Sequence, residues 1–312
     1  MGERLKGKAA VVTGGAGGVG APICRALAAE GASLVVNDIG AVRDGSGSST
    51  GPVENVVNEI KKSGGMAIAN YESVVDFAGA ERLIKTCVDS YGRIDILVNV
   101  HGNLRDRMIW NMTEDEWDSV INIHLKGTFN TCRHACVRMR EQKYGRIINV
   151  TSTAWRGATG HVNYSAAKGG VVSLTRAIAR EMGKYGVTAN CFDPLAATRM
   201  TLSDEVVAGM TERYKQGIMT KEQLDEILNL PGPGYVPPFI VYLASDKAAN
   251  INGRVFHVEK GRIALYSEPI EEKAIYKTEA EGMWTVDELE HAVPNTLLVG
   301  YVNIAPSQEA SK

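Results

Sequence analysis

The chain has 312 residues, enough to bury one large hydrophobic core or two small ones. The net charge is -2, so the chain lacks the overall basic excess that follows a nucleic-acid backbone. No stretch has the length of a membrane span, and the first residues, MGERLKGKAAVV, lead into a strand pattern without a signal-peptide core. We therefore expect no nucleic-acid or membrane partner and a cytoplasmic location.

The charge is unevenly distributed along the chain. Residues 263–312 contain nine Asp or Glu and three Lys, a net of -6, which leaves about +4 for residues 1–262. An acidic solvated tail explains this distribution, and a mildly basic remainder also suits an anionic ligand. The five cysteines show no paired framework, and Cys132 and Cys136 have no second Cys/His pair beside them. We expect reduced thiols and no metal site.

In chain order, short apolar runs alternate with longer amphipathic stretches, as in a parallel sheet covered by helices on both faces. The apolar runs predict seven strands: Ala9–Thr13, Ser33–Asp38, Met66–Asn70, Ile94–Val100, Arg146–Thr151, Thr188–Asp193 and Arg254–Glu259. The stretches between them predict helices near Gly18–Glu30, Pro52–Ser63, Phe77–Tyr91, Thr113–Arg140, Tyr164–Tyr185 and Pro237–Ser245. This order predicts an α/β fold, a Rossmann-type doubly wound parallel sheet with right-handed crossovers.

Three segments depart from this rhythm. Ala41–Gly51 is rich in Gly and Ser and should form a loop after the second strand. Residues 201–234 carry helical patterning followed by PGPG, and their place at the carboxyl edge of the sheet suits a lid over a substrate. Residues 263–312 form a C-terminal extension in which Thr285 begins a helix capping box. We expect this extension to pack on the domain formed by residues 1–262.

A glycine-rich loop joins the first strand to the first helix. Gly14, Gly18 and Gly20 follow the pattern TGxxxGxG, with Val19 between the last two. Glycines there let the backbone approach a pyrophosphate at the N-terminal end of the helix, although glycine turns also occur for structural reasons alone. The position after a buried strand near the N-terminus favours dinucleotide binding.

Asp38 ends the second strand, 18 residues after Gly20. A carboxylate there accepts hydrogen bonds from ribose hydroxyls and repels a 2′-phosphate, which favours NAD as the cofactor. Its alternative role is to cap a turn. Arg43 in the following loop could receive a phosphate, so NADP is the second possibility.

Tyr164 and Lys168 stand at i, i+4, neighbours on one helix face. Pairs of this kind usually only pack together. An ammonium beside a phenol favours the phenolate, however, and lowers the Tyr pKa from ~10 toward neutrality, where Tyr can exchange protons. Ser152 ends the fifth strand 12 residues before Tyr164, so its hydroxyl can polarise a carbonyl oxygen in the same pocket.

As a set, the glycine loop, Asp38, Asn99, Ser152 and the sequence YSAAK from Tyr164 resemble the short-chain dehydrogenases over residues 5–260. The resemblance implies an NAD-dependent oxidoreductase that interconverts a secondary alcohol and a ketone. It implies that Tyr164 exchanges a proton with the substrate oxygen and that Ser152 stabilises that oxygen. It also implies that Lys168 holds the nicotinamide ribose while lowering the Tyr pKa.

The same resemblance implies further cofactor contacts and an assembly. Asn99 would lie against the adenosine side of the cofactor, and Pro194 and Thr198 would contact it after the sixth strand. Small residues along the helix after Tyr164 leave one face able to pack closely, and members of the family form dimers or tetramers through such helices. We expect a homodimer or homotetramer.

Several segments are similar to the (3R)-hydroxyacyl-CoA dehydrogenase part of peroxisomal multifunctional enzyme type 2. They are VVNDIG from Val35, LRDR from Leu104, HLKG from His124 and YGRII from Tyr144. This similarity implies conversion of a (3R)-hydroxyacyl-CoA to a 3-ketoacyl-CoA. The alternatives are an NAD-dependent dehydrogenase of a steroid or cyclic alcohol, or a non-catalytic NAD-sensing protein. A sensing protein typically lacks the Tyr or the Lys, and this chain has both.

Two histidines depart from the family's usual pattern. His101 follows Asn99 and Val100 where Asn-Ala-Gly is usual, and is either a pocket-lining residue or a surface turn residue. His124 replaces the Asn of the usual catalytic tetrad, while Asn122 lies two residues earlier. Either side chain is a possible proton relay, since His can also pass protons.

Three further positions differ in residue type or spacing. Leu195 follows Pro194 where Gly is common, and Thr198 comes one residue early for the broad family. Ser152 is also one residue closer to Tyr164 than usual. Its neighbours Thr151 and Thr153 could therefore share its role.

Overall fold

The computed structural model describes residues 2–198, 201–202, 204–217 and 219–304. These residues fall into two compact units, Met1–Tyr266 and Ser267–Lys312. Ser203 and Ile218 of the predicted lid, and residues 305–312 of the predicted extension, lie outside the described residues. Residues 263–266 of the predicted extension belong to the first unit, and the packing of residues 267–312 on the rest of the chain stays a prediction.

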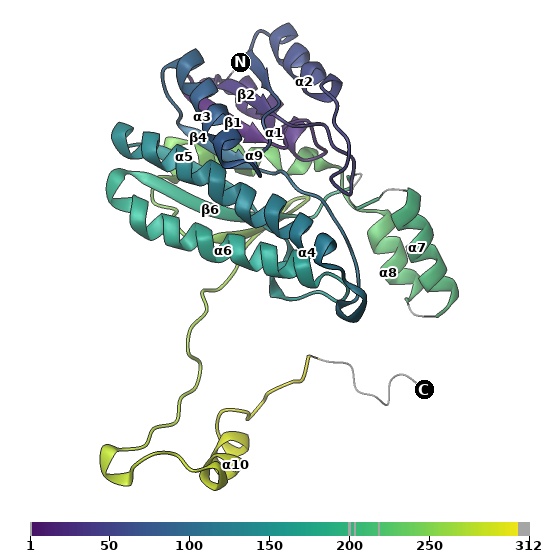
Figure 1. The fold of residues 1–312 in the computed structure, drawn as a ribbon, viewed down its shortest axis with the longest axis vertical. Coiled ribbons are helices and arrows are strands. Elements are labelled where there is room, and N and C mark those ends of the chain that lie inside the picture. The colour runs from purple at the N-terminus through teal and green to yellow at the C-terminus, as the bar shows by residue number, and fades with distance from the viewer. Residues whose placement is uncertain (1, 199–200, 203, 218, 305–312) are drawn as a thin grey trace. The chain divides into compact units, whose positions relative to one another are not determined.

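The first unit is built on one sheet with the strand order β3-β2-β1-β4-β5-β6-β7-β8 (Figure 1). The strands are β1 Ala9–Thr13, β2 Ser33–Asn37, β3 Met66–Asn70, β4 Ile96–Asn99, β5 Gly145–Val150, β6 Val187–Pro194, β7 Val255–Glu259 and β8 Arg262–Leu265. β1 to β7 are parallel, so the predicted doubly wound sheet is confirmed. The strand order reverses between β1 and β4, where ligands bind in such sheets.

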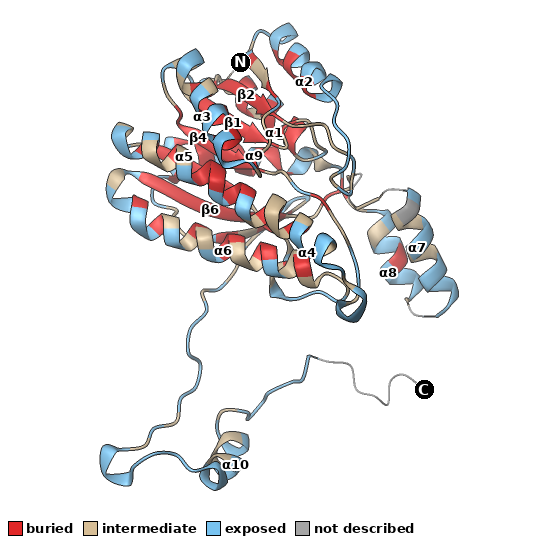
Figure 2. Cartoon of the chain, viewed as in Figure 1, coloured by how far each residue is buried: buried red, intermediate tan, exposed pale blue. Residues whose placement is uncertain are grey.

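Helices cover both faces of the sheet. The helices are α1 Gly20–Ala29, α2 Gly51–Lys62, α3 Phe77–Tyr91, α4 Glu114–Ile121, α5 Gly127–Gln142, α6 Val162–Met182, α7 Asp204–Lys215, α8 Lys221–Leu228, α9 Pro237–Ala244 and α10 Val286–Asn295. One core cluster joins the sheet to α1, α2 and α9 through residues such as Leu27, Val57 and Ile240. A second joins it to α3, α5 and α6 through Leu83 and Met139. The strands β1 to β7 are consequently mostly buried, and the helices packed on them, α1 to α3, α5, α6 and α9, are exposed on their outer sides (Figure 2).

The sheet has an eighth strand, β8, where seven strands were predicted. Lys260 takes a positive φ of 47° and reverses the chain, and Arg262 then pairs antiparallel with Glu259. β8 lies at the edge of the sheet and is largely exposed. Three of its four residues are apolar, but this run is short and only two residues separate the strand from β7, so the sequence pattern did not reveal it as a separate strand.

The sequence predicts one helix over Thr113–Arg140, and the structure divides this segment into two helices. α4 and α5 are joined by a π-helical turn, Asn122–Lys126, instead of continuing as one α-helix. Thr113 caps α4 and forms a capping box with Glu116. π turns of this kind occur often at functional sites, and this one carries His124.

In the second unit, α10 begins at the predicted capping box, where the Thr285 hydroxyl accepts a hydrogen bond from the Glu288 amide at 3.3 Å. Several large apolar side chains of this unit are exposed, among them Tyr276 and Ile304. Among the described residues of either unit, no helix combines the length and the apolar content needed to cross a bilayer.

Candidate functional site

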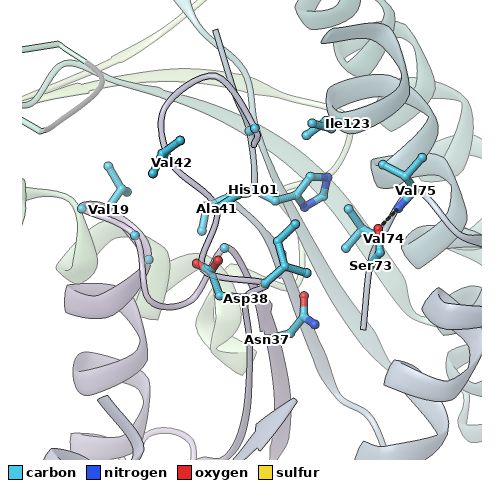
Figure 3. A pocket seen from close by; sticks show the side chains of 18 of the residues that line it. Val19, Asn37, Asp38, Ala41, Val42, Ser73, Val74, Val75, His101 and Ile123 are labelled. Atoms are coloured by element: carbon cyan, nitrogen blue, oxygen red, sulfur yellow. Dashed lines mark hydrogen bonds between the residues drawn. The ribbon is translucent and has the colours of Figure 1, made fainter. Parts of the chain in front are cut away.

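A cavity lies at the carboxyl edge of the sheet, over the reversal between β1 and β4 (Figure 3). Among its lining residues are the predicted cofactor-binding residues Gly14, Gly18, Val19, Gly20, Asp38 and Thr198. These six residues come from the first loop, the end of the second strand and the segment after β6. The structure places all six around one space.

Glycine is required at two positions of this loop. Gly14 has a φ of +67°, and a Cβ there would lie 2.6 Å from the backbone nitrogen of His101. A Cβ on Gly18 would lie 2.9 Å from the Thr198 side chain. The absence of side chains lets the loop pass close to its neighbours and leaves its backbone open to the cavity, as binding of a pyrophosphate requires.

Asp38 directs its carboxylate into the cavity and also fixes the backbone around it (Figure 3). Its oxygens accept hydrogen bonds from the Gly40 amide at 2.8 Å and the Ala16 amide at 3.2 Å. Arg43 is engaged elsewhere, since its guanidinium lies 3.0 Å from the carboxylate of Asp106. The cavity thus presents a carboxylate, and the one arginine proposed for a 2′-phosphate already has an anionic partner.

The Gly/Ser-rich loop 41–50 folds over this cavity. Val42 and Gly45 line the cavity, while Arg43 between them lines a second cleft. The loop is held by the Arg43 carbonyl, which accepts from the Leu104 amide at 3.1 Å. The Asp44 carbonyl also accepts from the Asn103 side chain at 3.3 Å. The loop consequently forms a wall of both spaces.

Asn99 and Pro194 are placed differently from the other predicted cofactor residues. The Asn99 side chain is buried beneath the cavity, where it donates to Asn149 Oδ1 at 2.8 Å and accepts from the Thr13 hydroxyl at 3.0 Å. Pro194 is the last residue of β6 and pairs with Val258. Neither is among the described residues that line the cavity, so their direct contact with a cofactor stays a prediction.

His101 lines the cavity, the first of the two alternatives left open by the sequence (Figure 3). Its Nδ1 lies 2.6 Å from the Thr13 hydroxyl. Burial, assisted by the charge of Lys168, lowers the pKa of His101 to about 3. His101 is therefore neutral at physiological pH and cannot attract the cofactor by charge.

The predicted catalytic residues come from the end of β5 and the first turns of α6. Ser152 follows β5 and caps the short 3-10 helix Thr153–Arg156, accepting from the Ala154 amide at 3.3 Å. Asn163, which the sequence reasoning missed, fixes the start of α6. Its Oδ1 accepts from the Tyr164 amide at 2.7 Å, and its Nδ2 donates to the carbonyl of Arg105 in the preceding loop and to that of Glu116 in α4. Its position directly before Tyr164 was the only available signal.

Burial controls the ionisation of the Tyr164–Lys168 pair. It raises the pKa of Tyr164 to about 12, against a hydrogen bond from Ser152 that lowers it. It lowers the pKa of Lys168 to about 7. The Lys168 ammonium lies 5.5 Å from the Tyr164 ring centre and donates to the Val150 carbonyl at 2.9 Å. In the protein alone, the expected lowering of the Tyr164 pKa is therefore wrong, and both groups favour their neutral forms.

His124 is held by the backbone of the segment after β4. Its Nε2 lies 2.8 Å from the Asn103 carbonyl and 3.1 Å from the Asn103 amide. Its ring meets the Tyr164 ring edge-on, with centres 5.0 Å apart. Burial first, and then the charge of Lys168, keep the His124 pKa well below its usual range. Asn122 is the first residue of the π turn. Among the described residues, its side chain forms no hydrogen bond with Tyr164.

A second, larger cleft of about 940 Å³ adjoins this site. Residues from α7 and α8 line it, opposite the loops around Arg107 and His161, and the role of residues 201–234 as a substrate lid stays a prediction. Its apolar lining residues are Leu104, Met108, Val206, Met210, Ile227 and Leu230. Arg43, Arg107, Arg213 and Asp106 also line the cleft, and Arg43 and Arg107 are paired with Asp106 and Glu116. The cleft thus combines an apolar lining with three guanidinium groups, two of which already have a carboxylate partner.

The sequence matches the short chain dehydrogenase family over residues 8–206. It is 39% identical to the peroxisomal hydratase-dehydrogenase-epimerase of Neurospora crassa over 267 residues, 85% of this chain and 28% of that protein. It is 37% identical to the hydroxyacyl-CoA dehydrogenase ChsB1 of Mycobacterium tuberculosis over 278 residues, 85% of this chain and 81% of that protein. This chain therefore spans less than a third of the Neurospora protein.

The fold is also similar to a solved structure, a short chain dehydrogenase from Mycobacterium avium. The TM-score is 0.78 at 39% sequence identity, covering 94% of this chain and 95% of the other. The family match includes the glycine loop and the Ser152, Tyr164 and Lys168 positions, and such a fold implies a nicotinamide cofactor. The chain belongs to the short-chain dehydrogenase family and is an oxidoreductase of that family.

Proposed function

We propose that this chain is a cytoplasmic, NAD-dependent dehydrogenase that interconverts a (3R)-hydroxyacyl-CoA and a 3-ketoacyl-CoA. The observation that carries the proposal is the cleft beside the start of α6, whose apolar lining suits an acyl chain and whose Arg213 suits an anionic carrier. The similarity to a protein named hydroxyacyl-CoA dehydrogenase supports the same substrate class. We also propose that the chain works as a homodimer or homotetramer.

The residues around the first cavity fit NAD. The open backbone at Gly14, Gly18 and Gly20 would hold the pyrophosphate at the start of α1, and Asp38 would accept hydrogen bonds from the adenosine ribose. Arg43 is paired with Asp106 and lines the second cleft, which supports NAD over NADP. When bound, the nicotinamide supplies the hydride acceptor for oxidation and the hydride donor for reduction.

The chain's own residues would manage the substrate oxygen and its proton. Ser152 would donate a hydrogen bond to that oxygen, and Tyr164 would give or take the proton. With a pKa of about 12, Tyr164 is a proton donor at neutral pH, the form needed for ketone reduction. Alcohol oxidation requires Tyr164 as a phenolate, and a nearby positive charge stabilises that form. Protonated Lys168, next to the Tyr164 ring, would supply this charge.

The test is a comparison of kcat/KM for paired substrates. A (3R)-3-hydroxyacyl-CoA should be oxidised with NAD orders of magnitude better than its 3S isomer, because Tyr164 and the cofactor fix one face of the substrate. It should also exceed the matching pantetheine thioester, because truncation removes remote binding energy. Equal activity on a CoA-free steroid or cyclic alcohol would contradict the proposal and support the alternative substrate class.

A further inference from the structure

Loop 41–50, between β2 and α2, crosses the carboxyl edge of the sheet. The strands stand there in the order β2-β1-β4, and the loop leaves β2 and is bonded to the segment after β4. It therefore passes the end of β1, where Gly14 begins the glycine-rich loop. A dinucleotide with its adenosine at Asp38 and its nicotinamide near Tyr164 would run in the same direction. The loop consequently lies along the path of the cofactor.

The two ends of this loop are joined to each other. Gly40 has a φ of +68°, and a Cβ there would overlap the Ser49 carbonyl oxygen. The Ser49 amide also donates to the Ile39 carbonyl at 3.0 Å. Within the loop, the Val42 amide donates to the Ser46 carbonyl at 2.9 Å. The loop is thus a compact flap on a narrow neck, as in an Ω-loop.

Asn103 holds the tip of the flap from the opposite side of the cavity. Its Nδ2 donates to the Asp44 carbonyl at 3.3 Å and to the Ser119 hydroxyl of α4 at 2.9 Å. The Asn103 side chain is fully buried, so its position is fixed. Gly45 permits the contact, since a Cβ at this residue with a φ of +89° would lie 3.1 Å from Asn103 Nδ2. The tip therefore rests directly on a fixed amide.

Three further contacts tie the same tip to the segment after β4. The Leu104 amide donates to the Arg43 carbonyl at 3.1 Å. The Arg105 guanidinium donates to the Asp44 carbonyl at 3.0 Å. The Arg43 guanidinium donates to the Asp106 carboxylate at 3.0 Å, and both side chains are partly buried. The tip is thus held through its backbone and through one ion pair.

The contacts of residues 43–44 with residues 103–106 form a latch, and the latch leaves little room beneath the loop. The first cavity has a volume of about 140 Å³. Sites that enclose an organic ligand usually measure roughly 300–1,000 Å³. A dinucleotide is too large to pass through the smaller space, so the loop must open whenever the cofactor enters or leaves.

We propose that loop 41–50 is a gate over the cofactor and that the latch, through Asn103 and the Arg43–Asp106 pair, sets how often it opens. The inference rests on the proposed binding of NAD in the first cavity. Asn103 is not among the described residues that line that cavity, so it acts on the cofactor through the loop and is a positioning residue. Because one opening serves both directions, a weaker latch accelerates both entry and release of the dinucleotide.

The experiment is stopped-flow fluorescence of NADH with the full chain and no substrate. Release is measured by displacement with excess NAD, and entry from the dependence of the observed rate on NADH concentration. Asn103→Leu keeps the approximate side-chain volume and removes both donated hydrogen bonds. The release and entry rates should each rise about threefold to tenfold, as expected for the loss of one hydrogen bond to the loop.

Arg43→Met tests the same latch at a partly buried position, so the result does not depend on the folding of the buried Asn103 variant. Both rates should rise here too. Loss of this positive charge would by itself slow the entry of an anionic cofactor, so faster entry reports the gate and not the charge. Ser48→Ala, an exposed residue of the same loop outside the latch, is the matched control and should leave both rates unchanged.

Hydrogen exchange provides a readout without any cofactor. The Leu104 amide donates to the Arg43 carbonyl, so it exchanges with solvent only when the latch opens. In Asn103→Leu this amide should exchange faster by a factor similar to the change in the NADH rates. Faster exchange with unchanged NADH rates would overturn the proposal, because opening would then not control the cofactor.

Two kinetic results would also overturn it. One is release and entry at the wild-type rates in both latch variants. The other is faster release with unchanged entry, which would mean that the loop only contacts the bound cofactor and does not gate it. A wild-type chain that binds neither NADH nor NADPH would instead contradict the proposed function, and the gate would lose its role with it.

Discussion

Replacing Lys168 by Met should stabilise the cofactor-free protein at neutral pH while removing activity. The Lys168 side chain is 2% exposed, and burial lowers its pKa from 10.5 to about 7. At 1.36 kcal/mol per pKa unit, this difference corresponds to about 5 kcal/mol of folding free energy lost when the ammonium must be buried. Met also leaves the Val150 carbonyl without its donor, which costs about 1–3 kcal/mol. We expect a net gain of about 2–4 kcal/mol at pH 6.

The sign of this effect should reverse with pH. The unfolded chain binds more protons than the folded one between pH 7 and 10.5, so wild-type stability rises through that window. Below about pH 7 the penalty is fully present, and near pH 10.5 only the loss at Val150 remains. Lys168→Met should therefore become less stable than wild type, by about 1 kcal/mol or more, near pH 10.

The assay is urea unfolding of the cofactor-free protein at fixed protein concentration, followed by circular dichroism from pH 6 to pH 10. Lys61→Met on the exposed side of α2 is the matched control and should show no such pH-dependent difference. A Lys168→Met protein that is destabilised equally at every pH would refute the reasoning. It would mean that the ammonium is solvated in the folded state.

Tyr164→Phe should lower kcat about a hundredfold or more while NAD binding, measured by calorimetry, survives; near-normal turnover would remove Tyr164 as the proton-transfer group. Asp38→Ser should lower kcat/KM for NAD and move the NAD/NADP preference toward NADP, unless wild type already prefers NADP, in which case our interpretation of Asp38 is wrong. Gly102→Ala would place a Cβ 2.3 Å from His124, so we expect a loss of about 1–3 kcal/mol in urea unfolding. Light scattering at micromolar concentration should show a dimer or tetramer, and a monomer alone would contradict the predicted assembly.

The parts of this fold that could be predicted are those with a strong local signal. β1 and β3 have the predicted bounds because each is a short run between turn residues, paired to a neighbouring strand. β8 was missed because its apolar run is only three residues long and only two residues divide the strand from β7. The π turn at His124 was also hidden, since one extra residue in a helical turn leaves the sequence pattern almost unchanged.

The candidate site divides in the same way. Gly18 and Thr198 were singled out from motif spacing alone, and both line the cavity at the carboxyl edge of the sheet. The ionisation of Tyr164 was not, because burial depends on neighbours from distant segments and here outweighs the cation four residues away. Asn163 was missed for a similar reason. Its partners, the carbonyls of Arg105 and Glu116, lie 58 and 47 residues away in the sequence and are brought to it only by the fold.

The loop after β2 has a consequence for the order of kinetic events. Val42 and Gly45 face one ligand space and Arg43 faces the other, and the backbone of this loop is bonded to the segment after β4. This one loop separates the two ligand spaces. A ligand that displaces the loop on one side therefore also changes the wall of the space on the other side. We expect an ordered steady-state mechanism, in which the dinucleotide binds first and leaves last. Product inhibition should then be competitive only between the oxidised and the reduced dinucleotide.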